Sequence, residues 1–327
     1  MKTETEINLI LGGAGFIGSN VAEALASQNR RVICIDDESL GNMEYLTARK
    51  IGNNSIIIGD INNNATWNTV KELVGAEAVH FWHLAANSDI SAGAFSLNPD
   101  YFKTLSTTVS LINNLKDFNV KRISFSSTSA VYGEDSAFPS ETSPTNPISN
   151  YGAAKLSSEL FLKIHCNREN IPLLIFRFAN IVGIPATHGV VFDFLNRIKN
   201  KTEKLEVKGN GTQQKSYLHS KDLVELMLQL VKHNHAGTWN LGLNDEGLRV
   251  SEIAELVVSH AAPNASIEYG IKPIGWPGDV NKISMNCSKI NAEKFRIQFT
   301  SSYEAIHQAI HDVCTQLNLE FKCPNVS

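Results

Sequence analysis

Near its N-terminus the chain carries the sequence Leu9-Ile-Leu-Gly-Gly-Ala-Gly-Phe-Ile-Gly18, in which an apolar run leads into glycines at three-residue intervals. Gly12, Gly15 and Gly18 permit a tight turn between a strand and a helix, and they let the backbone approach a pyrophosphate closely. The first turn of the helix adds N–H donors and a positive dipole. This stretch therefore predicts a dinucleotide-binding turn.

Acidic residues follow the second and third expected strands. Asp36 and Asp37 lie about 20 residues beyond the glycine turn, where a carboxylate can accept hydrogen bonds from the adenosine ribose and repels a 2′-phosphate. The sequence therefore favours NAD over NADP. Asp60, at the end of the third strand, would either face the adenine or cap the next element.

Short β-rich runs alternate with longer helical segments in the first half of the chain. We expect strands at residues 7–11, 31–35, 55–58, 79–84, 121–126 and 173–178, and helices at residues 16–28, 66–74, 99–118 and 149–168. This alternation predicts an α/β fold with a Rossmann-type, doubly wound parallel sheet. The later pattern is less regular. We therefore expect an NAD-binding Rossmann domain over residues 1–180 and a smaller C-terminal α/β substrate-binding lobe over residues 181–327.

Composition narrows the class of protein. The chain has 327 residues and a formal net charge of −4, which is unlike a duplex nucleic-acid binder. No apolar run approaches the roughly 18 residues of a membrane span, and the polar residues 1–6 do not resemble a signal peptide. The five scattered cysteines are typical of reduced thiols. We expect a cytoplasmic protein with no metal site and with no nucleic-acid or membrane partner.

Tyr151 and Lys155 stand four residues apart, which places both side chains on one face of a helix. An ammonium beside a phenol favours the phenolate, so such a tyrosine can act as a base near neutral pH. A hydroxyl-rich run beginning at Ser126 follows the fifth expected strand, at the carboxyl edge where open α/β sheets bind ligands. Together with the glycine turn, these residues predict redox chemistry on an alcohol.

With these motifs the chain resembles the extended short-chain dehydrogenases/reductases of the NAD-dependent epimerase/dehydratase type, most closely the UDP-glucose 4-epimerase branch. The resemblance extends from about residue 7 to residue 317. The matching motifs lie at residues 12–19, 83–86, 126–133, 151–155, 177–183, 209–212, 216–219 with Asp222, and 277–279.

The resemblance implies roles for individual residues. Thr128, Tyr151 and Lys155 would be catalytic, with Tyr151 as the base and Lys155 lowering the pKa of Tyr151 and holding the nicotinamide ribose. Further residues along the cofactor would be Phe16 and Ile17 at the turn, Asp60 and Ile61 at the adenine, Leu84, Ala85 and Ala86 at its middle, Ser126, and Phe178 at the nicotinamide. The substrate would contact Thr128, Asn180, His188, Val190, Lys215 and Trp276.

The implied reaction is inversion at C4 of a nucleotide-diphosphate sugar through a transient 4-keto intermediate, with NAD taking and returning the hydride. A 4-dehydrogenase or 4-keto reductase would use the same residues and is an alternative. A 4,6-dehydratase or a decarboxylase is disfavoured, because Ser129 and Ala130 stand where those enzymes carry an additional acid or base. A noncatalytic NAD-binding sensor is a remote alternative.

Two substrate positions depart from the family pattern. Lys215 stands at a usual arginine position near the diphosphate, so the charge is kept but the bidentate fork is lost. Trp276 stands where galactose epimerases often carry a second diphosphate arginine, and it would either stack on a base or pack in the lobe. These departures leave the nucleotide and the sugar open.

The helix over residues 99–118 carries an apolar stripe. In related enzymes this helix and the helix of Tyr151 often pair across a two-fold axis. The resemblance therefore implies a homodimer.

Overall fold

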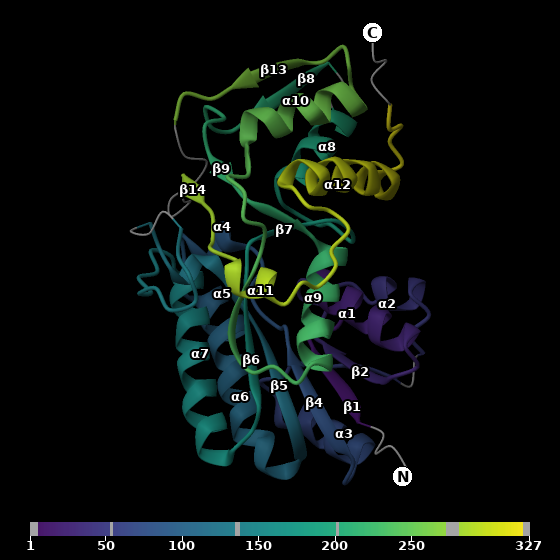
Figure 1. The fold of residues 1–327 in the computed structure, drawn as a ribbon. Helices are drawn as coiled ribbons and strands as arrows, with labels where there is room; N and C mark the ends of the chain where they lie inside the picture. The colour runs from purple at the N-terminus through teal and green to yellow at the C-terminus, as the bar shows by residue number, and fades with distance from the viewer. Residues whose placement is uncertain (1–5, 53–54, 135–137, 201–202, 273–280, 323–327) are drawn as a thin grey trace. The chain divides into compact units, whose positions relative to one another are not determined.

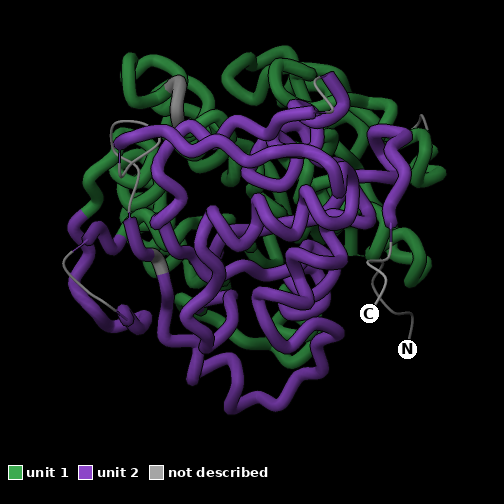
Figure 2. The backbone as a smooth tube through the Cα atoms, turned by 90° about the horizontal axis from the view of Figure 1, so that it is seen from above, with its two compact units in different colours: residues 1–131, 147–177, 227–239 green, residues 132–146, 178–226, 240–327 purple. Residues whose placement is uncertain are grey.

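The computed structural model describes residues 6–52, 55–134, 138–200, 203–272 and 281–322. The chain forms two compact units (Figure 2). Unit 1 comprises residues 1–131, 147–177 and 227–239, and unit 2 comprises residues 132–146, 178–226 and 240–327. Each unit consists of three separate segments of the chain. A single domain boundary near residue 180 therefore stays a prediction.

A seven-stranded sheet with the order β11-β6-β5-β4-β1-β2-β3 forms the centre of unit 1 (Figure 1). Its strands are β1 (Ile7–Leu11), β2 (Arg31–Asp36), β3 (Ile56–Ile58), β4 (Ala78–His83), β5 (Asn119–Thr128), β6 (Leu173–Phe178) and β11 (Gly237–Leu241). The pairs β1–β2, β1–β4, β2–β3 and β4–β5 are parallel. The strand order runs outward from β1 in both directions, which confirms the predicted Rossmann-type fold.

The central strands are buried along their whole length. Every residue of β1 and β4 is buried, as expected where helices cover both faces of a parallel sheet. The helices of unit 1 are α1 (Phe16–Ser27), α2 (Glu44–Ala48), α3 (Asn64–Val74), α4 (Ile90–Gly93), α5 (Asn98–Asp100), α6 (Ser106–Asn114) and α7 (Asn150–Glu169). The single helix expected over residues 99–118 is instead divided by a π-helical turn, η2 (Tyr101–Leu105), between α5 and α6, and it ends in a 3-10 turn, η3 (Leu115–Asp117).

Both ends of α7 are set by local sequence. The Ser149 hydroxyl accepts a hydrogen bond from Gly152 N at 3.1 Å and so caps the first turn. Asn170 adopts the left-handed conformation, with φ of 53°, and ends the helix. The cap places Tyr151 in the first turn of α7, and Lys155 follows one turn later.

Unit 2 is built from short strands and longer helices. Its described sheets have the orders β10-β7, β12-β9-β14 and β13-β8. The strands are β7 (Asn180–Val182), β8 (Lys204–Val207), β9 (Gln214–Lys215), β10 (Tyr217–His219), β12 (Leu248–Arg249), β13 (Ser266–Tyr269) and β14 (Lys282–Ile283). The helices are α8 (Val190–Asn200), α10 (Val250–Ala261), α11 (Ser288–Ala292) and α12 (Ser302–Leu317), and α9 (Ser220–Lys232) begins here and ends in unit 1.

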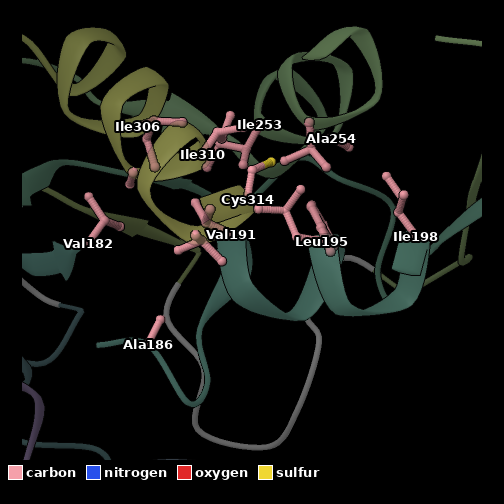
Figure 3. Close-up of a cluster of buried hydrophobic side chains, with 14 of the residues drawn as sticks. Val182, Ala186, Val191, Leu195, Ile198, Ile253, Ala254, Ile306, Ile310 and Cys314 are labelled. Atoms are coloured by element: carbon pink, nitrogen blue, oxygen red, sulfur yellow. The ribbon is translucent and has the colours of Figure 1, made fainter. Parts of the chain in front are cut away.

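The core of unit 2 lies between α8, α10 and α12. Figure 3 shows Leu195 of α8, Ile253 of α10 and Ile310 of α12 directed toward one another, and all three are fully buried. None of the described helices is both long enough and apolar enough to cross a membrane.

We predict that Trp67→Ala lowers the free energy of unfolding by about 3–5 kcal/mol. Trp67 of α3 is only 1% exposed, its ring packs on Phe81 and Phe118, and its Nε1 donates to the Ile61 carbonyl at 2.7 Å. Urea unfolding followed by circular dichroism measures the change. Ile58→Ala, at a 66% exposed side chain of β3, is the control and should cost less than about 1 kcal/mol. Equal losses in the two variants would contradict this description of the core.

Candidate active site

The glycine turn lies between β1 and α1 and is too tight for side chains. A Cβ atom on Gly12, whose φ is +81°, would lie 2.7 Å from Ala85 N, and one on Gly18 would lie 2.0 Å from Gly12 O. Gly15 is the N-cap residue of α1, and it provides no side-chain hydrogen bond to the first turn of the helix. Its first N–H groups are therefore available to an anion. This cradle fits the pyrophosphate of a dinucleotide.

Asp36 is the last residue of β2 and Asp37 follows it, and the two carboxylates have different surroundings. Asp36 is buried, and its carboxylate accepts hydrogen bonds from Ala14 N and Glu38 N, each at 2.9 Å. Burial raises the pKa of Asp36 despite these two bonds. Asp37 is exposed and accepts from Ser39 N and Oγ. Asp36 therefore fastens the glycine turn to the end of β2, beside the place expected for the ribose.

The other residues expected at the cofactor also lie in unit 1. Asp60 is exposed and accepts from Asn62 N at 2.8 Å, so it caps the turn after β3, while Ile61 is buried. Phe16 and Ile17 begin α1. Half-buried residues follow β4 directly, namely Leu84, Ala85 and Ala86. Because the carboxyl ends of parallel strands share one edge of a sheet, the fold brings these segments together along the edge that carries the glycine turn.

Lys155 is 1% exposed and reaches the end of β5. Its Nζ donates to the Ser126 carbonyl at 2.5 Å and to Ser126 Oγ at 3.2 Å. The same nitrogen lies 4.8 Å from the ring centroid of Phe125 and 6.0 Å from that of Tyr151. Burial lowers the pKa of Lys155 to about 7, and the negative charge of Glu159 acts in the opposite direction. The amine can therefore change its charge near neutral pH.

The pKa of Tyr151 is raised, which is opposite to the expected direction. Burial of the phenol is the main cause, the charge of Asp100 adds to it, and a hydrogen bond with the Thr128 side chain lowers the pKa in part. The role expected for Lys155, lowering this pKa, stays a prediction, because burial of the phenol and the charge of Asp100 dominate the shift in this structure. A phenolate here needs additional positive charge.

Thr128 completes the cluster at the last residue of β5. Its Oγ1 accepts from Ala130 N at 3.1 Å, and its side chain hydrogen-bonds to Tyr151. Gly152 lets α7 approach this loop closely, since a Cβ atom there would lie 2.7 Å from the Ala130 carbonyl. Unit 1 thus brings Ser126, Thr128, Tyr151 and Lys155 together, where a hydroxyl, a phenol and an amine can exchange a proton.

Sequence reasoning missed Asp100. This residue of α5 is fully buried, and its Oδ1 accepts from Asn87 Nδ2 at 2.9 Å. Its Oδ2 has no hydrogen-bond partner among the described residues. Burial raises the pKa of Asp100, which in turn acts on Tyr151. No local pattern distinguishes this carboxylate from a surface residue near a helix N-terminus.

Apart from Thr128, the described residues expected at the substrate belong to unit 2, as does Phe178, which is buried at the end of β6. Asn180 of β7 donates through Nδ2 to the Ser216 carbonyl at 3.1 Å, so it is tied to the segment that carries Lys215 in β9. His188 is exposed and bonds to Thr187 Oγ1 at 2.9 Å, shortly before Val190 begins α8. Trp276 lies outside the described residues.

The described part of the chain contains no group of three or more His, Cys, Asp or Glu side chains that could hold a metal ion.

The model of the NAD dependent epimerase/dehydratase family matches residues 8–242, and the chain belongs to this family. The family assignment confirms NAD as the cofactor. A UDP-glucose 4-epimerase of Corynebacterium glutamicum is 29% identical over 279 residues, which cover 78% of this chain and 81% of the relative. A probable UDP-arabinose 4-epimerase 3 of Oryza sativa subsp. japonica is 26% identical and covers 92% of this chain and 80% of its own.

Solved structures with the same fold cover nearly the whole chain. The UDP-glucose 4-epimerase of Thermotoga maritima with UDP-glucose is 26% identical with a TM-score of 0.81, covering 95% of this chain and 99% of that one. The UDP-glucose 4-epimerase of Thermus thermophilus in complex with NAD is 22% identical with a TM-score of 0.82, covering 94% of this chain and 98% of that one. The second likeness concerns the fold alone.

We predict that Gly18→Ala reduces the NAD that copurifies with the protein to less than about a tenth of the wild-type amount, a loss of roughly 1.4 kcal/mol or more in binding. The added methyl group would collide with the Gly12 carbonyl and open the turn. Chromatography of nucleotides released by denaturation measures occupancy. Gly52→Ala is the matched control, because a Cβ atom at Gly52 meets nothing within 4 Å. Full occupancy in a folded Gly18→Ala variant would exclude this turn as the NAD site.

Proposed function

We propose that this protein is an NAD-dependent epimerase that inverts C4 of a nucleotide-diphosphate sugar through a transient 4-keto intermediate. The family assignment and the relatives named as 4-epimerases support the proposal. The observation that carries it is the cluster of Thr128, Tyr151 and Lys155 at the carboxyl edge of the sheet, in the same unit as the glycine turn.

When bound, NAD supplies a hydride acceptor at the substrate carbon and, in its oxidised form, a positively charged ring. The Tyr151 oxygen removes the proton of the C4 hydroxyl and later returns it. Thr128 holds the phenol in place through their hydrogen bond, and Lys155 supplies positive charge one helical turn away. Because burial and Asp100 raise the pKa of Tyr151, the phenolate forms only while compensating positive charge is present.

The residues beside Thr128 favour epimerisation over the eliminating reactions. Ser129 is buried and Ala130 is half-buried in the 3-10 turn η4 (Ser129–Val131), and neither side chain is an acid or a base. A 4,6-dehydration or a decarboxylation needs a further proton transfer after oxidation. Without that group, reduction of the 4-keto sugar on one face or the other is favoured over elimination or decarboxylation.

A UDP-linked sugar is the proposed substrate, since the relatives are named for UDP-glucose and UDP-arabinose. In unit 2, Lys215 would neutralise the diphosphate and Asn180 would hydrogen-bond to the substrate. The direct test is incubation of the purified protein, with no added NAD, with UDP-glucose, UDP-galactose, UDP-arabinose and UDP-N-acetylglucosamine. Formation of a C4 epimer detected by NMR supports the proposal. Accumulation of a 4-keto sugar with enzyme-bound NADH would instead identify a dehydrogenase.

We predict that Tyr151→Phe lowers kcat by about 10²–10⁴-fold, because it removes the proton acceptor. NAD should still copurify with this variant, which separates loss of chemistry from loss of cofactor. Tyr303→Phe, at an exposed position of α12, is the control and should keep wild-type kcat. Retention of wild-type turnover by a folded Tyr151→Phe variant would exclude Tyr151 as the base.

A homodimer is also proposed, on the basis of exposed apolar side chains on η2, α6 and α7. These elements pack against one another in unit 1. Their exposed members, which we call the apolar α6–α7 face, are Tyr101, Phe102, Val109, Leu160, Phe161 and Ile164. Soluble monomers rarely expose contiguous apolar patches of this kind, and a second copy of the same face would cover it.

A cytoplasmic location is proposed because the described cysteines are free.

We predict that Ile164→Glu converts the dimer into a monomer, because it places a charge in an apolar interface. Light scattering after size-exclusion chromatography at micromolar concentration measures the mass. Ile58→Glu is a matched control, since Ile58 and Ile164 are each 66% exposed and Ile58 lies on β3, which is not one of the elements that form this face. A monomeric mass for the wild-type protein would refute the proposed dimer.

A further inference from the structure

We propose that Glu159 is a positioning residue of the catalytic cluster, which keeps Lys155 charged and holds the end of β5 against α7 through Ser127. The inference rests on the proposed function only in taking Lys155 as catalytic. The motif formed by Tyr151 and Lys155 does not include Glu159.

Glu159 is completely buried, and its carboxylate is saturated with hydrogen bonds. Oε1 accepts from Ser127 Oγ at 2.6 Å and from Arg177 Nε at 2.9 Å. Oε2 accepts from Arg177 Nη2 at 2.8 Å and from Lys163 Nζ at 3.1 Å. The donors come from β5, β6 and α7, so one buried anion joins three elements of unit 1. A buried carboxylate of this kind is retained only where its partners compensate its desolvation.

Consecutive residues at the end of β5 are bonded to successive turns of α7. Ser126 accepts from Lys155, Ser127 donates to Glu159, and Thr128 hydrogen-bonds to Tyr151. The three α7 residues stand at four-residue intervals, which places them on one stripe of the helix. Ser127 lies between Ser126 and Thr128 on β5, and Glu159 lies one turn beyond Lys155 on α7. Their hydrogen bond therefore fixes the end of β5 beside the two contacts that serve catalysis.

Glu159 also affects the protonation of the Lys155 amine. The groups that face the Lys155 amine are Ser126 and the Phe125 ring of β5, Tyr151 and Glu159 of α7, and His83 of β4. Burial and the charge of Lys155 lower the pKa of His83 to about 3, so this imidazole is neutral. Asp100 acts on Tyr151. Glu159 is thus the carboxylate that favours the ammonium form of Lys155.

Glu159 itself stays ionised. Burial raises its pKa, but the hydrogen bonds from Arg177 and Ser127 and the charges of Arg177 and Lys163 bring the pKa below its ordinary value. Removing this negative charge lowers the pKa of Lys155 further. The lysine then loses its proton at a lower pH, and the alkaline limb of the pH profile of kcat moves in the acid direction. A residue with a merely structural role would lower kcat at every pH without moving that limb.

The test compares Glu159→Gln with two matched variants in the NAD-bound protein. We expect Glu159→Gln to move the alkaline limb of kcat by roughly one pH unit or more toward acid. Ser127→Ala removes one neutral hydrogen bond to the same carboxylate and should lower kcat without moving the limb. Lys163→Met removes the half-exposed cation from that carboxylate and should not shift the limb toward acid. Identical profiles for Glu159→Gln and Ser127→Ala would overturn the charge effect.

An NMR titration provides a readout that does not depend on activity. The ε-carbon signal of Lys155 is followed in protein labelled with ¹³C-lysine and is assigned with Lys155→Met. We expect its midpoint to fall in Glu159→Gln, and an unchanged midpoint in the folded variant would refute the proposal. If the wild-type protein epimerises no nucleotide sugar, the proposed function fails while this titration still tests the effect of Glu159 on Lys155.

Glu159→Gln removes the negative charge that Glu159 provides to the buried Arg177, which can prevent folding. The double variant Glu159→Met/Arg177→Leu removes both charges together and serves as the second variant. It should also move the Lys155 midpoint toward acid, but by less than Glu159→Gln, because the positive charge of Arg177 is removed as well. If neither variant folds, Glu159 is a folding residue and the proposal is rejected.

Discussion

The buried amine of Lys155 is the constraint on which the catalytic cluster depends. It is almost completely removed from water, and it is held by the Ser126 carbonyl and hydroxyl and by the face of the Phe125 ring. An isolated ammonium in such a place is disfavoured, and its pKa falls to about 7. The same desolvation raises the pKa of Tyr151. The phenol and the amine are therefore both closer to neutrality than in water, and ionising the phenol needs positive charge nearby.

Much of this arrangement could be predicted from local sequence. The spacing of Gly12, Gly15 and Gly18 after an apolar strand indicated the turn, and the four-residue spacing of Tyr151 and Lys155 indicated a shared helix face. These features depend on residues near one another in the chain. The alternation of strands and helices likewise indicated the Rossmann-type sheet. One edge strand of this sheet, β11, comes from a part of the chain well after the other strands.

The features that the sequence did not indicate depend on contacts between distant elements. Asp100 influences Tyr151, 51 positions further along, only because α5 and α7 pack together. The pairing of Glu159 with Arg177 depends on the packing of α7 on β6. The direction of the pKa shift of Tyr151 depends on burial, which residue spacing does not give. Electrostatic balance inside a protein is set by the whole set of neighbours rather than by one motif.

Unit 2 holds its expected substrate residues by a separate polar network. Asp245 accepts from Ser216 Oγ at 2.8 Å and from Ser302 Oγ at 2.9 Å, and Ser302 Oγ accepts from Tyr217 N at 2.8 Å. These bonds fix the segment between β9 and β10 to the start of α12. Asn180 is tied to the same segment through the Ser216 carbonyl. Two of the expected substrate residues, Asn180 and Lys215, thus lie in or beside one hydrogen-bonded segment, which would suit recognition of the part of a nucleotide sugar that does not react.

In the proposed reaction, Tyr151 exchanges the hydroxyl proton while the C4 hydrogen leaves as hydride to bound NAD and is returned to the same carbon. The most direct measurement uses a UDP-sugar that carries deuterium at C4, converted by the protein in ordinary water and examined by NMR. If the hydride passes to NAD and returns to the same carbon, the epimeric product keeps its deuterium at C4. Epimerisation with loss of deuterium to the solvent would contradict it.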